Sequence, residues 1–343
     1  MSDPIEFLDL MERAEQQRQA RRGFIRLCGG AAAMTGGLAL LSGCGDDNNG
    51  SSPTPSPTPT PSGAMTDVAV LNFALQLEYL EGAYYAYAVS GSGVDGALLT
   101  GMGTQGAVVT GSGAGAARAV DFSDDVVAEY AREIAADEIG HIRFLRETLG
   151  SARVAQPAIN ISGSASVETA GATTVGAFTA AARAAGVVGA SDIFDPYAND
   201  ESFLIGAYLL TDVGVSAYRG AAKLLTNKTY LEASAGILAA ECYHDATIRA
   251  ELWRRGLTVP SIYTRVSQIS ALRDSLDGAG ETDQDIGTAA AANVVPTDSD
   301  GLVLGRSAAQ VLNVVFQSSA AVTGGGFFPA GLNGTLLTSG AGG

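Results

Sequence analysis

The chain has 343 residues, of which 36 are acidic and 20 are basic, and its formal net charge is −16 at pH 7. Binding to phosphate groups needs a basic patch, so this charge balance argues against nucleic acid as a partner. The acidic residues and arginines of residues 1–43 cancel, so the whole negative excess lies in the rest of the chain.

The first segment, residues 1–43, is predicted to be a targeting signal rather than part of the fold. Arg21 and Arg22 open the twin-arginine pattern RRGFIR, and a weakly apolar stretch follows over residues 27–41. This stretch is shorter than the roughly 20 residues that span a bilayer as a helix. It ends in LSGC, which resembles a bacterial lipobox, so we expect cleavage before Cys44 and a lipid anchor on that cysteine. The alternative is an ordinary signal peptide followed by a coincidental cysteine.

Residues 44–65 are predicted to be a tether, because proline alternates with threonine and serine. Such a composition favours extended polyproline structure and cannot build a core. We therefore expect a protein exported by the twin-arginine route to the periplasm or cell envelope, and held at a membrane. Beyond the signal and Cys44 only Cys242 remains, so no intramolecular disulfide is expected in the exported body. Cys242 is expected to be a small buried residue rather than a ligand.

Four long segments have helical periodicity, and they predict an all-α four-helix bundle over residues 66–258. They are 67–89, which is apolar nearly all round, 123–149, which begins at Ser123 as N-cap, 201–225 and 230–255. Two long connections interrupt them, 90–119 and 151–200, and the second contains a short helix near 175–185. Residues 259–343 are predicted to be a C-terminal helical and irregular extension packed on the bundle, with amphipathic stretches at 266–276 and 308–316.

The two histidines each lie three residues after a glutamate, in the pairs Glu138–His141 and Glu241–His244. Residues i and i+3 of a helix project from one face, so each pair can present a carboxylate oxygen and an imidazole nitrogen to one point. Both pairs fall on the apolar stripe of their helix, whereas Asp137 falls on the opposite face. A buried carboxylate is unfavourable unless it is paired or binds a cation, so the pattern predicts a metal site in the core. The alternative is hydrogen bonding between Glu and His within each helix.

The first long segment adds Glu78 and, seven residues later on the same face, Tyr85. With these positions the chain resembles the ferritin-like superfamily, in which a metal-binding Glu of the first helix is followed seven residues later by a Tyr. The resemblance implies one ligand set: Glu78 as a terminal carboxylate, Glu138 and Glu241 as bridges, and His141 and His244 as nitrogen ligands. It also implies a catalytic role for Tyr85, as a phenol that can hydrogen-bond or supply an electron near one or two Fe or Mn ions.

A narrower resemblance is carried by the twin-arginine signal, by AECYH at residues 240–244 and by GGFFP at residues 325–329. These motifs are similar to those of an exported bacterial ferritin-like group, which is itself similar to plant desiccation-related proteins.

One position departs from the ferritin-like pattern. The third long segment should carry a Glu seven residues before Tyr218, but Thr211 stands there, and a threonine hydroxyl is a poor ligand beside carboxylates. Asp212 is rotated about 100 degrees away and is expected to be solvated. Glu81 could lean in and compensate, or it could pair with a base elsewhere. A site of five ligands could hold two unequal metals, or one that is tightly bound and one that exchanges.

Three functions are compatible with these patterns. The first is a metal-dependent oxidoreductase that oxidises Fe(II) or reacts with oxygen or peroxide, because a mixed Glu/His ligand set suits Fe or Mn. The second is metal binding without turnover. The third is a stress- or desiccation-related structural protein with a partial or vestigial metal site.

Overall fold

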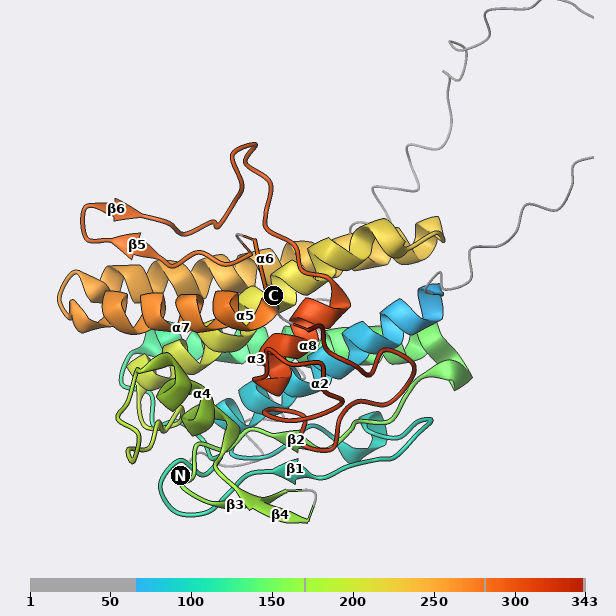
Figure 1. Ribbon diagram of the computed structural model, residues 1–343, viewed down its shortest axis with the longest axis horizontal. Coiled ribbons are helices and arrows are strands. Elements are labelled where there is room, and N and C mark those ends of the chain that lie inside the picture. Colours follow the sequence, from blue (N-terminus) through green and yellow to red (C-terminus); the bar gives the residue numbers. More distant parts are fainter. Residues whose placement is uncertain (1–65, 170, 281, 342–343) are drawn as a thin grey trace, which may run out of the picture. The chain divides into compact units, whose positions relative to one another are not determined.

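The computed structural model describes residues 66–169, 171–280 and 282–341 (Figure 1). The expected signal segment, the tether and Cys44 lie outside the described residues. The helices are α2 (Asp67–Ser90), α3 (Asp125–Leu149), α4 (Ala177–Ala185), α5 (Asp200–Ala221), α6 (Lys228–Gly256), α7 (Ser261–Asp277) and α8 (Ala308–Phe316). The predicted all-α ferritin-like bundle is confirmed: α2, α3, α5 and α6 are its long helices. Within the described residues, no helix is both long and apolar enough to span a bilayer.

The helix ends follow from local capping chemistry. The Thr66 side chain accepts a hydrogen bond from the amide of Ala69 at the start of α2, and Gly91 ends the helix in the left-handed conformation, with φ 71°. The predicted N-cap of α3 is wrong by one residue. Asp124 caps the helix by accepting from the amide of Val126, while the hydroxyl of Ser123 donates to Asp200 instead.

The core lies between two packed helix pairs. Helix α2 packs along α3, α5 packs along α6, and α2 and α5 also contact each other in the middle of the bundle. Both central helices are buried around most of their circumference, with Leu75, Tyr84 and Leu204 fully shielded from solvent. This environment explains why the sequence of α2 has apolar residues on every face.

The two long connections pair with each other, which the sequence did not predict. Strand β1 (Val108–Val109) in the first connection runs parallel to β2 (Ile159–Asn160) in the second. Two further hairpins are short: β3 (Val167–Thr169) with β4 (Ala172–Thr174), and β5 (Gly287–Thr288) with β6 (Ala291–Ala292). These strands cover the outside of the bundle and contribute none of the residues of the candidate site (Figure 1).

The chain after α6 packs back onto the bundle. The amide of Arg306 donates to the carbonyl of Ser216 on α5 at 2.9 Å. The backbone comes so near that a methyl group at Gly220 would lie 1.8 Å from the carbonyl oxygen of Arg306, so only glycine fits there. Farther along, Phe327 is buried against Phe178 of α4. The irregular part of the C-terminal extension therefore contributes Phe327 to the packed core.

A buried ion-pair network ties this C-terminal segment to α5 and α6. Arg249 donates to both carboxylate oxygens of Asp212 at 2.9 Å, and Arg273 donates to the same carboxylate. Asp283 pairs with Arg273 at 2.8 Å and with Arg306 at 2.7 Å. The expectation that Asp212 is solvated is wrong, since only 7% of it is exposed. Burial opposes its ionisation, but Arg249 and Arg273 outweigh that effect and lower its pKa to about 2.

We predict that Arg306→Ala lowers the free energy of unfolding by about 3–5 kcal/mol, because one buried carboxylate loses its arginine and a second loses one of its two arginines. These are Asp277 and Asp283, at 2.5 Å and 2.7 Å from the Arg306 guanidinium. The control is Arg254→Ala, which removes an ion pair of Glu251 with a 60% exposed arginine, and should change stability by about 1 kcal/mol or less. Urea unfolding measures both. Equal losses would show that the network does not hold the C-terminal segment.

Candidate metal centre

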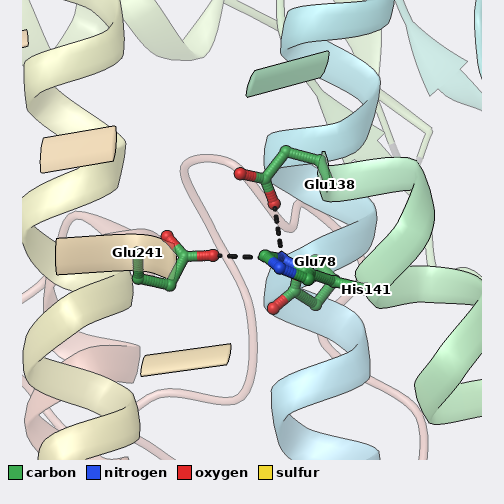
Figure 2. A group of neighbouring side chains, drawn as sticks. All are labelled: Glu78, Glu138, His141 and Glu241. Atoms are coloured by element: carbon green, nitrogen blue, oxygen red, sulfur yellow. Dashed lines mark hydrogen bonds and ion pairs between the residues drawn. The ribbon is translucent and has the colours of Figure 1, made fainter. Parts of the chain in front are cut away.

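Three helices bring four ligand-type side chains to one point in the core. Glu78 comes from α2, Glu138 and His141 come from α3, and Glu241 comes from α6 (Figure 2). One ligand atom from each lies within 4.8 Å of all the others. His141 Nδ1 is at the centre, 3.2 Å from Glu78 Oε2, 3.5 Å from Glu138 Oε2 and 3.3 Å from Glu241 Oε1. The i, i+3 spacing on α3 places Glu138 and His141 on the same inward face.

His244 lies on the other side of Glu138. Its Nδ1 is 3.1 Å from Glu138 Oε1, so the two oxygens of Glu138 face different histidines. The outer nitrogen of His244, Nε2, is 3.2 Å from Asp137 Oδ2. The expectation that Asp137 faces away from the site is therefore wrong. A carboxylate on Nε2 fixes the ring so that Nδ1 faces inward, an arrangement typical of metal-binding histidines.

Two buried tyrosines lie beside the site, Tyr85 on α2 and Tyr218 on α5. Tyr218 donates a hydrogen bond to Glu78 Oε1, which leaves Oε2 of that carboxylate toward His141. The hydroxyl of Tyr85 lies 3.0 Å from Thr211 Oγ1, and Thr211 donates in turn to the carbonyl of Ala207. Tyr85 is therefore hydrogen-bonded to Thr211, the residue at the α5 position where the ferritin-like pattern has a glutamate. Tyr218 is the phenol that touches a carboxylate of the cluster.

Glu81, one turn after Glu78 on α2, is also buried beside the cluster. Burial raises its pKa well above the ordinary value, and Glu241 is the neighbour that raises it most. Cys242 is half-buried rather than buried, and burial raises its pKa to about 11, which keeps the thiol protonated at neutral pH.

The electrostatics of the cluster are those of carboxylates without enough cations. Burial raises the pKa of Glu78 to about 8, and burial together with Glu138 also raises that of Glu241. Glu138 goes the other way: His141 and His244 outweigh the effect of burial and lower its pKa. Burial works against a charge on His244, but Asp137 and Glu138 outweigh it and raise its pKa to about 10. Without a bound cation, protonated imidazoles therefore provide the positive charge that balances the buried carboxylates.

The residues present fit a bound metal. Five buried ligand-type atoms around the cluster form no hydrogen bond of good geometry: Glu81 Oε2, Glu138 Oε1 and Oε2, Glu241 Oε2 and His244 Nδ1. Both oxygens of Glu138 are nevertheless in ion-pair contact with a histidine, at 3.1 Å from His244 Nδ1 and 3.5 Å from His141 Nδ1. Buried polar atoms are nearly always hydrogen-bonded in native structures, so five such atoms in one place need an explanation. Carboxylate and imidazole donors together suit Fe or Mn. The hydrogen-bonding alternative within each helix does not explain these atoms.

Glu-x-x-His pairs on two helices and a carboxylate on a third, all directed into a four-helix bundle, define the class of ferritin-like carboxylate–histidine proteins. A family model described as a ferritin-like domain matches residues 66–253, more than half of the chain, and the chain belongs to this family. All the residues of the cluster lie within the matched range.

Two relatives carry informative names. The desiccation-related protein PCC13-62 of Craterostigma plantagineum is 28% identical over 226 residues, which is 64% of this chain and 64% of the relative. The ferritin-like catalase Nec2 of Nesocodon mauritianus is 26% identical over 283 residues, which is 79% of this chain and 84% of the relative. The chain thus spans less than two thirds of PCC13-62. The predicted similarity to plant desiccation-related proteins is confirmed. No solved structure gives a significant match.

We predict that metal-free protein loses stability as the pH rises, and that metal-loaded protein loses less. Glu78 and His244 bind protons more tightly when folded, with pKa values of about 8 and 10. Their contribution is complete below the ordinary values of 4.5 and 6.5 and is lost as the pH rises through the folded values. Bound metal replaces these protons.

The measurement is the melting temperature of chelator-treated and Mn(II)-loaded protein between about pH 6 and pH 9. The chelated form should fall more steeply. Glu78→Gln is the matched control, because it removes one titrating group and should flatten the slope of the chelated form. Parallel curves for the two forms would contradict the role assigned to the cluster.

Proposed function

We propose that this protein binds one or two Fe or Mn ions at the cluster of Glu78, Glu138, His141, Glu241 and His244. The observation that carries the proposal is the set of buried ligand atoms that form no hydrogen bond of good geometry. Glu138 and Glu241 are suited to bridging, because the two oxygens of Glu138 face His141 and His244 separately. Glu78 and the Nδ1 atoms of the two histidines are the proposed terminal ligands, each bound to one ion.

We further propose that the site breaks down hydrogen peroxide. A relative that covers most of this chain is named a ferritin-like catalase, which supports this reaction class over oxidation of Fe(II). A redox-active metal would relay two electrons from one peroxide molecule, which is oxidised to dioxygen, to another, which is reduced to water. The chain's own contribution is to exclude bulk water with apolar helices and to hold a proton at Tyr218, which donates to Glu78. No other oxidant or reductant is needed for this stoichiometry.

The place of action is part of the proposal. The twin-arginine pattern at Arg21 and Arg22, the lipobox-like LSGC before Cys44 and the proline-rich residues 44–65 support export and a lipid anchor. We propose that the bundle acts in the periplasm or cell envelope, on a tether attached to the membrane.

A second function is favoured by one departure from the family pattern. Thr211 provides no carboxylate, and a relative is named a desiccation-related protein. In this alternative the domain is a stress or structural protein with a partial metal site and no turnover.

Metal content and peroxide consumption test these functions together. Protein purified without chelators should contain Fe or Mn, whereas Glu138→Ala should lose it and consume peroxide at least about 100-fold more slowly, since a ligand matters more than its outer-sphere support. The control is Glu129→Ala, which removes an exposed carboxylate of the same helix and should change neither quantity.

Each outcome separates the alternatives. Metal that disappears in Glu138→Ala, without peroxide consumption by the parent protein, would favour the stress-related function. Absence of Fe and Mn from the parent protein, even after incubation with Fe(II) or Mn(II), would contradict metal binding altogether.

A further inference from the structure

The bundle has an internal correspondence between its two central helices. Positions on α2 and α5 match in pairs at identical spacing: Glu78 with Thr211, Glu81 with Gly214, and Tyr85 with Tyr218. The tyrosines contact the opposite helix, since Tyr218 reaches Glu78 and Tyr85 reaches Thr211. Helix α5 therefore keeps its tyrosine but provides no carboxylate at either of the other two positions, whereas α2 provides two.

The carboxylate of Glu81 occupies space on α5 that is free because residue 214 is a glycine. A methyl group at Gly214 would lie 2.7 Å from Glu81 Oε1 and 3.3 Å from Glu241 Oε2. Both oxygens thus lie next to one point on α5, where any side chain would displace them. Glu81 reaches across from α2 into the half of the site that belongs to α5.

The ligand-type atoms divide into two groups around the bridging carboxylates. In the first group, His141 Nδ1 is surrounded by Glu78 Oε2, Glu138 Oε2 and Glu241 Oε1. On the other side, His244 Nδ1 lies 3.1 Å from Glu138 Oε1, and Glu241 Oε2 is the remaining oxygen of the other bridge. These three atoms and Glu81 Oε2 are buried and form no hydrogen bond of good geometry.

The side of Glu81 that faces away from the cluster is apolar. Away from the cluster it lines a small cavity between α2, α5 and α8, and every other residue of that wall is apolar or glycine. An ionised carboxylate between an apolar wall and three further carboxylates is unfavourable unless a cation lies on the cluster side.

We propose that Glu81 is the terminal carboxylate of a second metal position, made with Glu138 Oε1, Glu241 Oε2 and His244 Nδ1. This inference rests on the proposed metal binding and extends it. The carboxylate that α5 does not supply at Thr211 comes from α2 instead, and Gly214 provides the room. The site then has four carboxylates and two histidines, enough for two ions in a bridged pair.

Binding of Mn(II) to chelator-treated protein tests this directly, with stoichiometry from elemental analysis and the spin state from electron paramagnetic resonance. The parent protein should bind about two Mn(II) per chain and give the spectrum of a coupled pair. Glu81→Gln should bind about one and give the six-line spectrum of an isolated Mn(II) ion. Half-occupancy in this near-isosteric variant would not follow from a merely structural role for Glu81.

Gly214→Ala provides a second test that leaves Glu81 chemically intact. The new methyl group meets the far end of a flexible side chain, so the helix should fold while the Glu81 carboxylate is displaced, and the stoichiometry should again fall to about one. Its control is Gly236→Ala on α6, where a methyl group would meet nothing within 4 Å and the stoichiometry should stay at about two.

Two Mn(II) ions with a coupled spectrum in both Glu81→Gln and Gly214→Ala would overturn the role of Glu81 and leave the proposed metal binding intact. A single Mn(II) in the parent protein would also overturn it. No Mn(II) bound to the parent protein would instead contradict the proposed function itself.

Discussion

The architecture depends on one electrostatic constraint: four buried glutamates lie together with two histidines in the middle of a helical bundle. Glu78, Glu81, Glu138 and Glu241 are each at most 6% exposed. Without a metal, the cluster reaches balance only by retaining protons, which is why the pKa values of Glu78 and His244 rise. Two neighbouring contacts also stabilise the charges of the cluster: Tyr218 donates a hydrogen bond to Glu78, and Asp137 forms an ion pair with His244.

The same bundle contains a second group of buried acids that is balanced in a different way. Asp212 and Asp283 are neutralised by three almost fully buried arginines, at positions 249, 273 and 306. That network is permanent and attaches the C-terminal segment to α5 and α6. In the described part of the chain, the ion pairs of Glu78, Glu138 and Glu241 are formed with histidines alone. A site balanced by titratable imidazoles can exchange protons for metal, whereas one balanced by guanidinium groups cannot.

Much of this could be predicted from the sequence, because it depends on local periodicity. The long helices and the inward direction of Glu138, His141 and Glu241 follow from the spacing of residues on a helix. The environment of Asp212 could not be predicted, since its partners come from Arg249 and Arg273, far along the chain. Helical geometry also suggested the wrong side for Asp137, because His244 of the neighbouring helix α6 comes within 3.2 Å of its carboxylate, a tertiary contact that the spacing within α3 does not reveal. The pairing of the two long connections likewise depends on tertiary contacts alone.

The proposed metal site assigns the buried carboxylate and imidazole atoms of the cluster as ligands. The most direct measurement is a crystal structure of Mn(II)-loaded protein with an anomalous difference map at the manganese edge. Two peaks are expected between Glu138 and Glu241, one beside Glu78 and His141 and the other beside Glu81 and His244. A map without a peak at the cluster, with the side chains hydrogen-bonded to water or to each other, would contradict this assignment.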